Sequence, residues 1–130
     1  MNTSTETQAP RRIQRQRTAG WRKPEGAVYV GRPTPFGNPY RITRIGTVWC
    51  VYVDIPDTGR TITVSTVFDE RQARQDAVDG FRDMFCTPGG AEQAEYFARE
   101  LHGRDLLCWC APDMPCHADV LLEIANGAAS

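Results

Sequence analysis

Two short apolar runs, one near each end of the chain, predict buried strands. Residues 27–31 read Ala-Val-Tyr-Val-Gly, and residues 106–110 read Leu-Leu-Cys-Trp-Cys. Neither run alternates between polar and apolar positions, which is typical of strands that are covered on both faces. Because helical segments separate the two runs, we expect the strands at about 27–31 and 105–110 to form a parallel core pair.

The middle of the chain predicts an inserted β-hairpin. Two segments within residues 47–66 are rich in β-branched and aromatic side chains, and Pro56-Asp57-Thr58-Gly59 between them carries turn chemistry. In the second segment polar residues alternate with Ile62 and Val64. This alternation predicts one face toward solvent and one buried face.

Three further segments place their apolar residues at the spacing of one helix face. They run over about 69–86, 91–101 and 116–125. Asp69 is a suitable N-cap for the first helix, and Gly103 follows the second as a C-terminal signal. The order strand, hairpin, helix, helix, strand, helix predicts a small single-domain α/β fold.

Length and composition agree with one soluble globular domain. The chain has 130 residues, of which 41% are hydrophobic and 24% are charged. No apolar run is long enough to span a membrane, and residues 1–10 lack the apolar core of a secretory signal. We therefore expect a cytoplasmic protein without a membrane partner. In such a chain five cysteines, an odd number, favour reduced thiols over disulfides.

The net charge of −1 hides a split along the chain. Residues 1–24 carry six basic side chains and one acidic one, so the remainder is acidic. We expect a disordered basic arm over residues 1–16, the α/β domain over 17–126 and a short tail over 127–130. A basic arm on an acidic body is able to contact phosphates, and it is equally typical of a solubilising terminus.

Chemically reactive side chains concentrate near the C-terminus. The ten residues from Cys108 to His117 contain three of the five cysteines and one of the two histidines. The three cysteines are Cys108, Cys110 and Cys116. Thiolates and imidazoles are the side chains that bind metals or act as nucleophiles. Because Cys108 and Cys110 are two residues apart on a predicted strand, we expect both sulfurs on one face and Trp109 on the other, in the core.

A second irregular segment, Arg32–Pro39, follows the first apolar strand. Its three prolines predict a rigid loop. If the two core strands are parallel, their carboxyl ends share the edge of the sheet at which ligands bind in open α/β folds. This loop is then expected beside the cysteine segment, where it would hold the anionic part of a substrate. The residues expected to bind the substrate are Gly31, Arg32, Gly37 and Asn38.

Three interpretations of the cysteines remain open. In the first, Cys108, Cys110 and Cys116 bind a metal, with zinc as the expected ion and His117 as an alternative ligand. Structural zinc sites usually separate their cysteines by two residues, but only one residue separates the first two here. The alternative within this interpretation is a catalytic metal site, which has three protein ligands and an open position for water. Asp119 is then the candidate acid or base.

The second interpretation is metal-free catalysis with Cys116 as the nucleophile. Cys116 begins the last predicted helix, where the helix dipole favours a thiolate, and His117 or His102 is the candidate base. In the third interpretation the thiols pack in the core and His117 caps the helix or forms a hydrogen bond with a carbonyl oxygen. Cys50 and Cys86 lie outside this segment. Cys50 is expected to be a small buried residue of the hairpin, and Cys86, which lies beside a loop, is not expected to belong to the site.

Three motifs of the chain occur together in a known family. They are Gly31-Arg32-Pro33, Gly37-Asn38-Pro39, and Cys108-Trp109-Cys110 followed by Cys116-His117-Ala118-Asp119. Over about residues 17–126 the chain resembles the bacterial and phage family called domain of unknown function 4326. The resemblance implies that the motifs form one functional unit. By association with phages and mobile elements, it also implies a nucleotide or nucleic-acid substrate.

The leading hypothesis is a small cytoplasmic enzyme, a metal-assisted or cysteine-based hydrolase or transferase. Its substrate would be a nucleotide, a nucleoside or a nucleic acid. Its candidate catalytic residues are Cys116, His117 and Asp119. The alternative is a non-catalytic phage or host regulator that binds nucleic acid through the basic arm and uses its thiols, or zinc, structurally.

Overall fold

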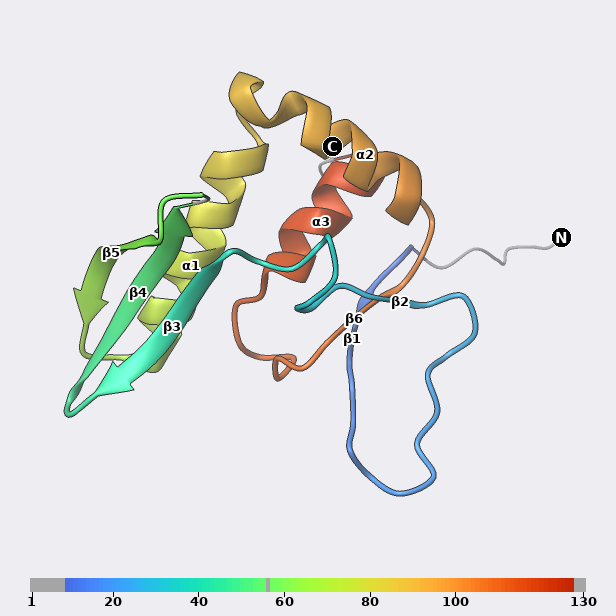
Figure 1. Cartoon of the computed structure of the whole chain (residues 1–130). Helices are drawn as coiled ribbons and strands as arrows, with labels where there is room; N and C mark the ends of the chain where they lie inside the picture. The colour runs from blue at the N-terminus through green and yellow to red at the C-terminus, as the bar shows by residue number, and fades with distance from the viewer. Residues whose placement is uncertain (1–8, 56, 128–130) are drawn as a thin grey trace, which may run out of the picture.

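A three-stranded parallel sheet forms the centre of the molecule (Figure 1). The computed structural model describes residues 9–55 and 57–127 of the chain. The strands of this sheet are β1 (Arg12–Gln14), β2 (Val28–Tyr29) and β6 (Leu106–Cys108), with β6 in the middle. Val28 pairs with Leu106 in parallel, so the predicted core pair is confirmed. All three residues of β6 are buried, which explains why its sequence does not alternate.

Strand β1 corrects the prediction of a disordered arm over residues 1–16. Arg12 pairs with Leu106, and beyond the strand Arg15 N donates a hydrogen bond of 2.7 Å to Cys108 O. Only Ile13 is apolar in this strand, so its composition resembles that of a solvated tail. The strand forms because β6 supplies backbone hydrogen-bonding partners. The folded domain therefore begins by residue 12. The outer parts of the predicted arm and tail, residues 1–8 and 128–130, lie outside the described residues.

The three predicted α-helices are confirmed. They are α1 (Glu70–Phe85), α2 (Ala91–Leu101) and α3 (His117–Asn126), and a 3₁₀ turn over Pro88–Gly90 separates the first two. The carboxylate of Asp69 caps α1 by accepting a hydrogen bond of 3.1 Å from Gln72 N. Within residues 9–55 and 57–127, no helix combines the length and the apolar character that crossing a membrane requires.

The predicted hairpin is also confirmed, and it belongs to a second sheet. Strands β4 (Val48–Ile55) and β5 (Arg60–Val67) pair in antiparallel fashion. A strand that the sequence pattern did not predict, β3 (Tyr40–Ile45), pairs with the other side of β4. Gly46, with a φ of 61°, allows the tight turn between β3 and β4.

Both faces of β5 are exposed from Arg60 to Val64, including the face that was expected to be buried. Ile62 and Val64 each expose 47% of their surface. Ser65 instead donates a hydrogen bond to Asp76 of α1, and Val67 packs against the small cluster beneath α1. The register of β4 and β5 shifts between Val51 and Tyr52. Such an irregularity changes which side chains of a strand face the neighbouring element.

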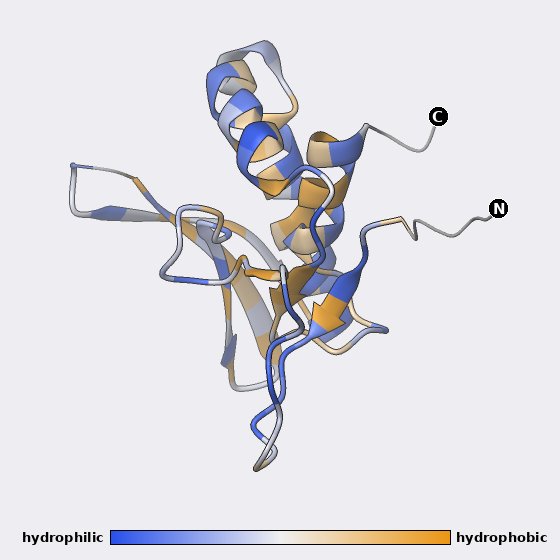
Figure 2. Ribbon diagram, turned by 90° about the vertical axis from the view of Figure 1, so that its right-hand side faces the viewer, coloured by the Kyte–Doolittle hydropathy of each residue, from blue (hydrophilic) through white to orange (hydrophobic). Residues whose placement is uncertain are grey.

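Helix α1 packs between the antiparallel sheet and the other two helices. It contacts β3, β4 and β5 of the antiparallel sheet, and it also contacts α2 and α3. The main core lies among the helices and β6, and a smaller cluster of Val51, Ala73 and Ala77 lies between α1 and β4. In Figure 2 apolar residues gather where β6 and α3 meet, while the connection between β1 and β2 is mostly hydrophilic. This packing brings the ends of β2 and β6 close to α3 and one flank of α1.

Candidate active site

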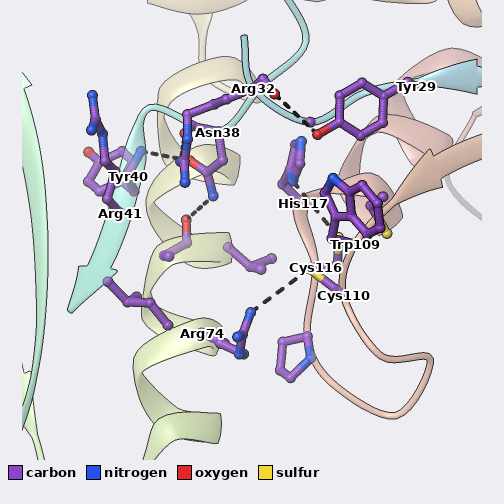
Figure 3. Close-up of a pocket in the computed structure, with 16 residues that line it drawn as sticks. Tyr29, Arg32, Asn38, Tyr40, Arg41, Arg74, Trp109, Cys110, Cys116 and His117 are labelled. Carbon is purple, nitrogen blue, oxygen red and sulfur yellow. Dashed lines mark hydrogen bonds between the residues drawn. The ribbon is translucent and has the colours of Figure 1, made fainter. Parts of the chain in front are cut away.

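The carboxyl ends of β2 and β6 open into a cavity of about 460 Å³ (Figure 3). Its wall contains residues of the loop after β2, the cysteine segment after β6, the start of α3, one flank of α1 and the beginning of β3. The loop that begins at Arg32 and the cysteine segment therefore share one cavity, as the parallel topology predicts.

Three thiols converge on one side of this cavity. Cys108 ends β6, Cys110 follows two residues later, and Cys116 is the N-cap residue of α3. Their Sγ atoms all lie within 4.8 Å of one another. Tetrahedral zinc holds thiolates at about 2.3 Å, which places two sulfurs about 3.8 Å apart. Movements of about 1 Å or less would therefore let the three thiols share one ion.

The charge around the thiols favours a thiolate at Cys110. Hydrogen bonds from Cys108 and Cys116 lower the pKa of Cys110 well below its usual range, and the positive charges of Arg74 and Arg12 act in the same direction. Arg74 Nη1 lies 3.9 Å from Cys110 Sγ, and Figure 3 shows this side chain pointing from α1 toward the sulfur. The hydrogen bonds of Cys108 to Cys110 and Cys116, followed by burial, raise the pKa of Cys108. The cluster thus concentrates its negative charge on one sulfur.

Arg12 of β1 ties the cysteine segment to the sheet. Its Nη2 donates hydrogen bonds to the carbonyl oxygens of Pro112 at 2.6 Å and Ala111 at 3.4 Å. Its Nη1 lies 3.5 Å from the carboxylate of Asp119 and, within the described chain, is buried without a hydrogen-bond partner. Burial alone lowers the pKa of Arg12, but the charges of Asp119 and Cys116 raise it overall. Arg12 is therefore a cation fixed beside the cluster.

His117 is held by a backbone carbonyl on one side and faces a thiol on the other. Its Nε2 lies 2.9 Å from Val30 O. Because a carbonyl oxygen only accepts, Nε2 is the donor in this hydrogen bond. Nδ1 lies 3.9 Å from Cys116 Sγ, and the ring packs edge-on against Phe81. His117 contacts the cluster but lies outside the group of three mutually close thiols.

Arg32 and Asn38, both predicted to bind substrate, both line the cavity. Arg32 Nη1 donates a hydrogen bond of 2.9 Å to Asn38 O. The Asn38 side chain is buried: Nδ2 donates to Ala77 O of α1 at 3.0 Å, and Oδ1 accepts from Tyr40 N at 2.9 Å. Asn38 thus holds the loop against α1 and thereby positions Arg32.

The two predicted glycines of this loop permit close approaches of the chain. A Cβ atom on Gly37 would lie 2.9 Å from Cγ and 3.2 Å from Cα of Arg32. A Cβ atom on Gly31 would collide with the ring of Tyr29. Gly31 lines the cavity, whereas Gly37 lies outside the lining and allows the close approach of Arg32, which does line it.

Asp119 and His102, the predicted acid or base residues, lie outside the cavity lining. The Asp119 side chain is 52% exposed and pairs with Arg12. His102 Nδ1 lies 2.9 Å from Ala125 O near the end of α3. Cys50 contacts Thr66 on the antiparallel sheet.

Trp109 was expected in the core but lies at the rim of the cavity. It exposes 39% of its surface, and the guanidinium groups of Arg15 and Arg17 cover its ring. Strand β6 ends at Cys108, so the alternation of the strand does not extend to Trp109. Trp109 instead lines the same cavity as Cys108 and Cys110.

Several cavity residues were not predicted from the sequence: Tyr29, Tyr40, Arg41 and Arg74. A single tyrosine or arginine at a strand end or on a helix carries no motif, so only the tertiary structure reveals its role. Arg41 also pairs with Asp54, and Arg74 with Glu70. Among the described residues, neither an aspartate nor a glutamate lines the cavity.

Comparison with known proteins identifies a family. A search of curated proteins and a search of solved structures found no match. One family model, described as Domain of unknown function (DUF4326), matches residues 13–127. This range begins within β1 and contains both loops and all three cysteines of the cavity. Because the match covers most of the chain, the protein belongs to the DUF4326 family.

Proposed function

We propose that the chain is an enzyme with a metal bound by Cys108, Cys110 and Cys116 at the wall of a nucleotide-binding cavity. The observation that carries this proposal is the convergence of three Sγ atoms within 4.8 Å beside a cavity of about 460 Å³. Structural zinc sites surround the ion with four protein ligands, whereas catalytic sites use three and leave one position for water or substrate. Three thiols beside a cavity match the second pattern.

The surroundings of the thiols support a charged cluster rather than simple packing. Structural buried cysteines behave as small hydrophobic residues. Here Arg74 Nη1 approaches Cys110, and the buried Nη1 of Arg12 lies beside the cluster without a hydrogen-bond partner in the described chain. Three thiolates around a divalent ion keep one net negative charge, and a neighbouring guanidinium compensates it. Such supporting groups are typical around metal ligands.

The lining of the cavity supports a ligand with phosphates and a planar base. Three arginines line it: Arg32 from the loop after β2, Arg41 from β3 and Arg74 from α1. Three aromatic rings do so as well: Tyr29, Tyr40 and Trp109. Guanidinium groups bind phosphate through charge-assisted hydrogen bonds, and aromatic faces stack on bases. A volume of about 460 Å³ lies within the range of small-molecule sites.

The proposed reaction class is hydrolysis or group transfer. A metal held by Cys108, Cys110 and Cys116 would supply an activated water or polarise a substrate oxygen. Arg32, which is fixed by its hydrogen bond to Asn38 O, orients the phosphate of the substrate. His117 keeps Cys116 in place through Nδ1, while its own ring is held by Val30 O.

A thiolate nucleophile without metal is a second candidate, and the geometry favours Cys110 for it rather than Cys116. Cys116 exposes 2% of its surface, whereas Cys110 is only partly buried and is the thiol that Arg74 contacts. In this case metal-free protein would react with iodoacetamide first at Cys110. Peptide mapping of the alkylated protein identifies the residue.

Metal content tests the leading proposal. Protein purified without a metal-affinity tag is expected to contain about one equivalent of zinc or a similar ion. Cys110→Ser should lose this metal, whereas the matched variants Cys50→Ser and Cys86→Ser should retain it, because those cysteines lie outside the cluster. Elemental analysis by mass spectrometry gives the stoichiometry, and circular dichroism shows whether each variant is folded.

Ligand binding tests the nucleotide part of the proposal. Calorimetric titration with nucleoside mono- and triphosphates should detect binding that Arg32→Ala weakens about tenfold or more. Arg82→Ala, which removes an exposed arginine between α1 and α3, should leave it unchanged. The proposal fails if a folded Cys108/Cys110/Cys116→Ala variant retains all ligand binding and turnover, or if no nucleotide binds.

A further inference from the structure

The connection between β1 and β2 places two arginines over aromatic rings at the edge of the cavity. The guanidinium carbon of Arg15 lies 4.8 Å from the ring centre of Tyr29 and 5.1 Å from that of Trp109. The guanidinium carbon of Arg17 lies 4.3 Å from the Trp109 ring centre. Both rings also line the cavity. Arg15, Arg17, Tyr29 and Trp109 therefore form a continuous surface, here called the rim strip, that leads into the cavity.

The sheet determines the position of the rim strip. Arg15 N donates a hydrogen bond of 2.7 Å to Cys108 O, which continues the pairing of β1 with β6. Gln14 Nε2 lies 3.4 Å from Trp109 O. Figures 1 and 2 show that the chain after β1 leaves the body beside β2 and β6 as a hydrophilic loop. The pairing of β1 with β6 therefore holds Arg15 and Arg17 at the edge of the cavity. A solvated tail would lack this pairing.

The rim strip presents charge and ring surface to the outside. Trp109 exposes 39% of its surface. Arg15 and Arg17 have no carboxylate within 4.0 Å in the parts of the chain that the structure describes. Their positive charges are therefore available to an external anion. Further along the same connection, Arg22 and Lys23 add two more positive charges.

This combination matches the chemistry of single-stranded nucleic acids. Exposed bases stack on aromatic rings and guanidinium planes, while phosphates accept hydrogen bonds from arginine. An acidic peptide would use the charges but not the ring faces, and a duplex hides the faces of its bases. The cavity at the end of the strip is large enough for a nucleotide-sized group but not for a helix.

We propose that the rim strip binds a single-stranded nucleic acid and directs one unpaired nucleotide of that strand into the cavity. This inference rests on the proposed function, because it takes the cavity as the place of the reacting nucleotide. The inference also restricts the class of substrate: we expect a nucleotide within a single strand rather than a free nucleotide.

Oligonucleotide binding tests the inference. Fluorescence anisotropy measures the binding of labelled 12-residue single-stranded DNA and RNA, and of an abasic strand with the same number of phosphates. The wild-type protein should bind the base-containing strands at least tenfold more tightly than the abasic strand and than a mononucleotide. The double variant Arg15→Ala/Arg17→Ala should lose about tenfold or more in strand binding. Its affinity for a mononucleotide should be unchanged, because neither arginine lines the cavity.

Two further variants separate stacking from charge. Arg17→Lys keeps the charge but loses the planar group, so it should weaken strand binding at constant salt. Arg99→Ala removes a guanidinium that covers Tyr96 on α2, at 5.8 Å from the ring centre and away from the rim strip. It should have no effect and serves as the matched control.

The outcomes distinguish this inference from the proposed function. If mononucleotides bind and strands bind no better, or if the abasic strand binds as tightly as the others, the rim strip is not a nucleic-acid site and the inference is wrong. If heparin or polyglutamate competes as well as the strand, an acidic polymer is the ligand and the inference is also wrong. If neither mononucleotides nor strands bind, the proposed function fails together with it.

Discussion

The two sheets of this protein differ in how they are stabilised and in what they contribute to the cavity. The parallel sheet has strands of two or three residues, yet its central strand β6 is buried throughout. The antiparallel sheet has strands of six to eight residues, but Ile62 and Val64 of β5 are 47% exposed. The cavity nevertheless lies at the end of the shorter sheet.

This difference indicates that burial, rather than the length of a hydrogen-bonded ladder, makes a strand suitable for carrying a site. A buried strand holds the residues that follow it in fixed positions, as a catalytic centre requires. The residues that directly follow β6 are Trp109 and Cys110, and both line the cavity. The longer sheet supplies cavity residues only from the first half of β3, at Tyr40, Arg41 and Ile42.

The largest expected effect comes from truncating one apolar side chain in each sheet. Leu106→Ala in β6 removes a fully buried side chain and should lower the free energy of unfolding by about 2–5 kcal/mol. Ile62→Ala in β5 should cost about 1 kcal/mol or less, because nearly half of that residue is already exposed. Urea denaturation of both variants measures the two values. Equal losses would show that the two sheets contribute alike to stability.

The second effect concerns Arg12, which links the short sheet to the cysteines. Arg12→Ala leaves the carbonyl oxygens of Ala111 and Pro112 without their donor and removes a cation from the cluster. We expect metal affinity to fall about 10–100-fold, as for other supporting residues of metal sites. Competition with a chelator of known affinity measures this change.

A matched control for Arg12 exists on the antiparallel sheet. Arg44 of β3 also donates a hydrogen bond to a carbonyl oxygen, that of Gly46, but it lies outside the cavity lining. Arg44→Ala should therefore leave metal affinity unchanged. If Arg12→Ala does the same, Arg12 serves only the pairing of β1 with β6.

The elements that the sequence predicts correctly are those with a strong local pattern. The continuous apolar run of β6 and the helical spacing of α1 are both visible without tertiary context. Strand β1 is not, because Ile13 is its one apolar residue and its partner lies more than ninety positions away in the chain. Strand β3 directly follows a proline-rich loop, and that breaker signal hides the alternation of Tyr40 and Ile42 with polar residues.

The features of the site also fall into those that a local sequence pattern predicts and those that depend on tertiary contacts. The spacing of Cys108 and Cys110 and the edge rule for parallel strands are enough to predict where the cavity lies. The contributions of Arg12 and Arg74 depend on side chains from other elements meeting the cysteines, and no local pattern encodes such a contact. For Asn38, which lines the cavity, the folded chain shows contacts that the sequence did not suggest. Its amide suggests a substrate donor, but in the folded chain this amide bonds to the backbone of Ala77 and Tyr40.

Two glycine substitutions, one beside the cavity and one in the antiparallel sheet, are expected to have smaller effects than those above. Gly37→Ala places a Cβ atom 2.9 Å from Cγ of Arg32, so Arg32 must shift and nucleotide binding should weaken severalfold, with a loss of about 1 kcal/mol in stability. Gly46→Ala, at a φ of 61° in the antiparallel sheet, should lower stability by about 1 kcal/mol without changing binding. Gly89→Ala has open space around its Cβ and is the neutral control. Calorimetric titration and urea denaturation measure both properties. Unchanged binding in Gly37→Ala would mean that Arg32 does not hold the ligand.

The smallest effect is the pH dependence of the ion pair that joins α1 to α3 on the side of the parallel sheet. Arg82 contacts both carboxylate oxygens of Glu123, at 2.6 and 3.1 Å. The hydrogen bond from Arg82 lowers the pKa of Glu123 below its ordinary value of 4.5. The pair therefore contributes its full stability above about pH 4.5 and loses it as the pH falls through the lowered pKa.

Because both side chains are about 40% exposed or more, solvent limits this contribution to less than about 1 kcal/mol. Glu123→Gln should be less stable than the wild-type protein at pH 7, and the difference should vanish in strong acid. Urea denaturation of both proteins between pH 2 and pH 7 measures the difference, and the single variant Arg82→Ala and the double variant Arg82→Ala/Glu123→Gln complete a double-mutant cycle. A difference that persisted at the lowest pH would assign the effect to packing of the Glu123 stem against α1, and the two helices would then be joined by contact area rather than by charge.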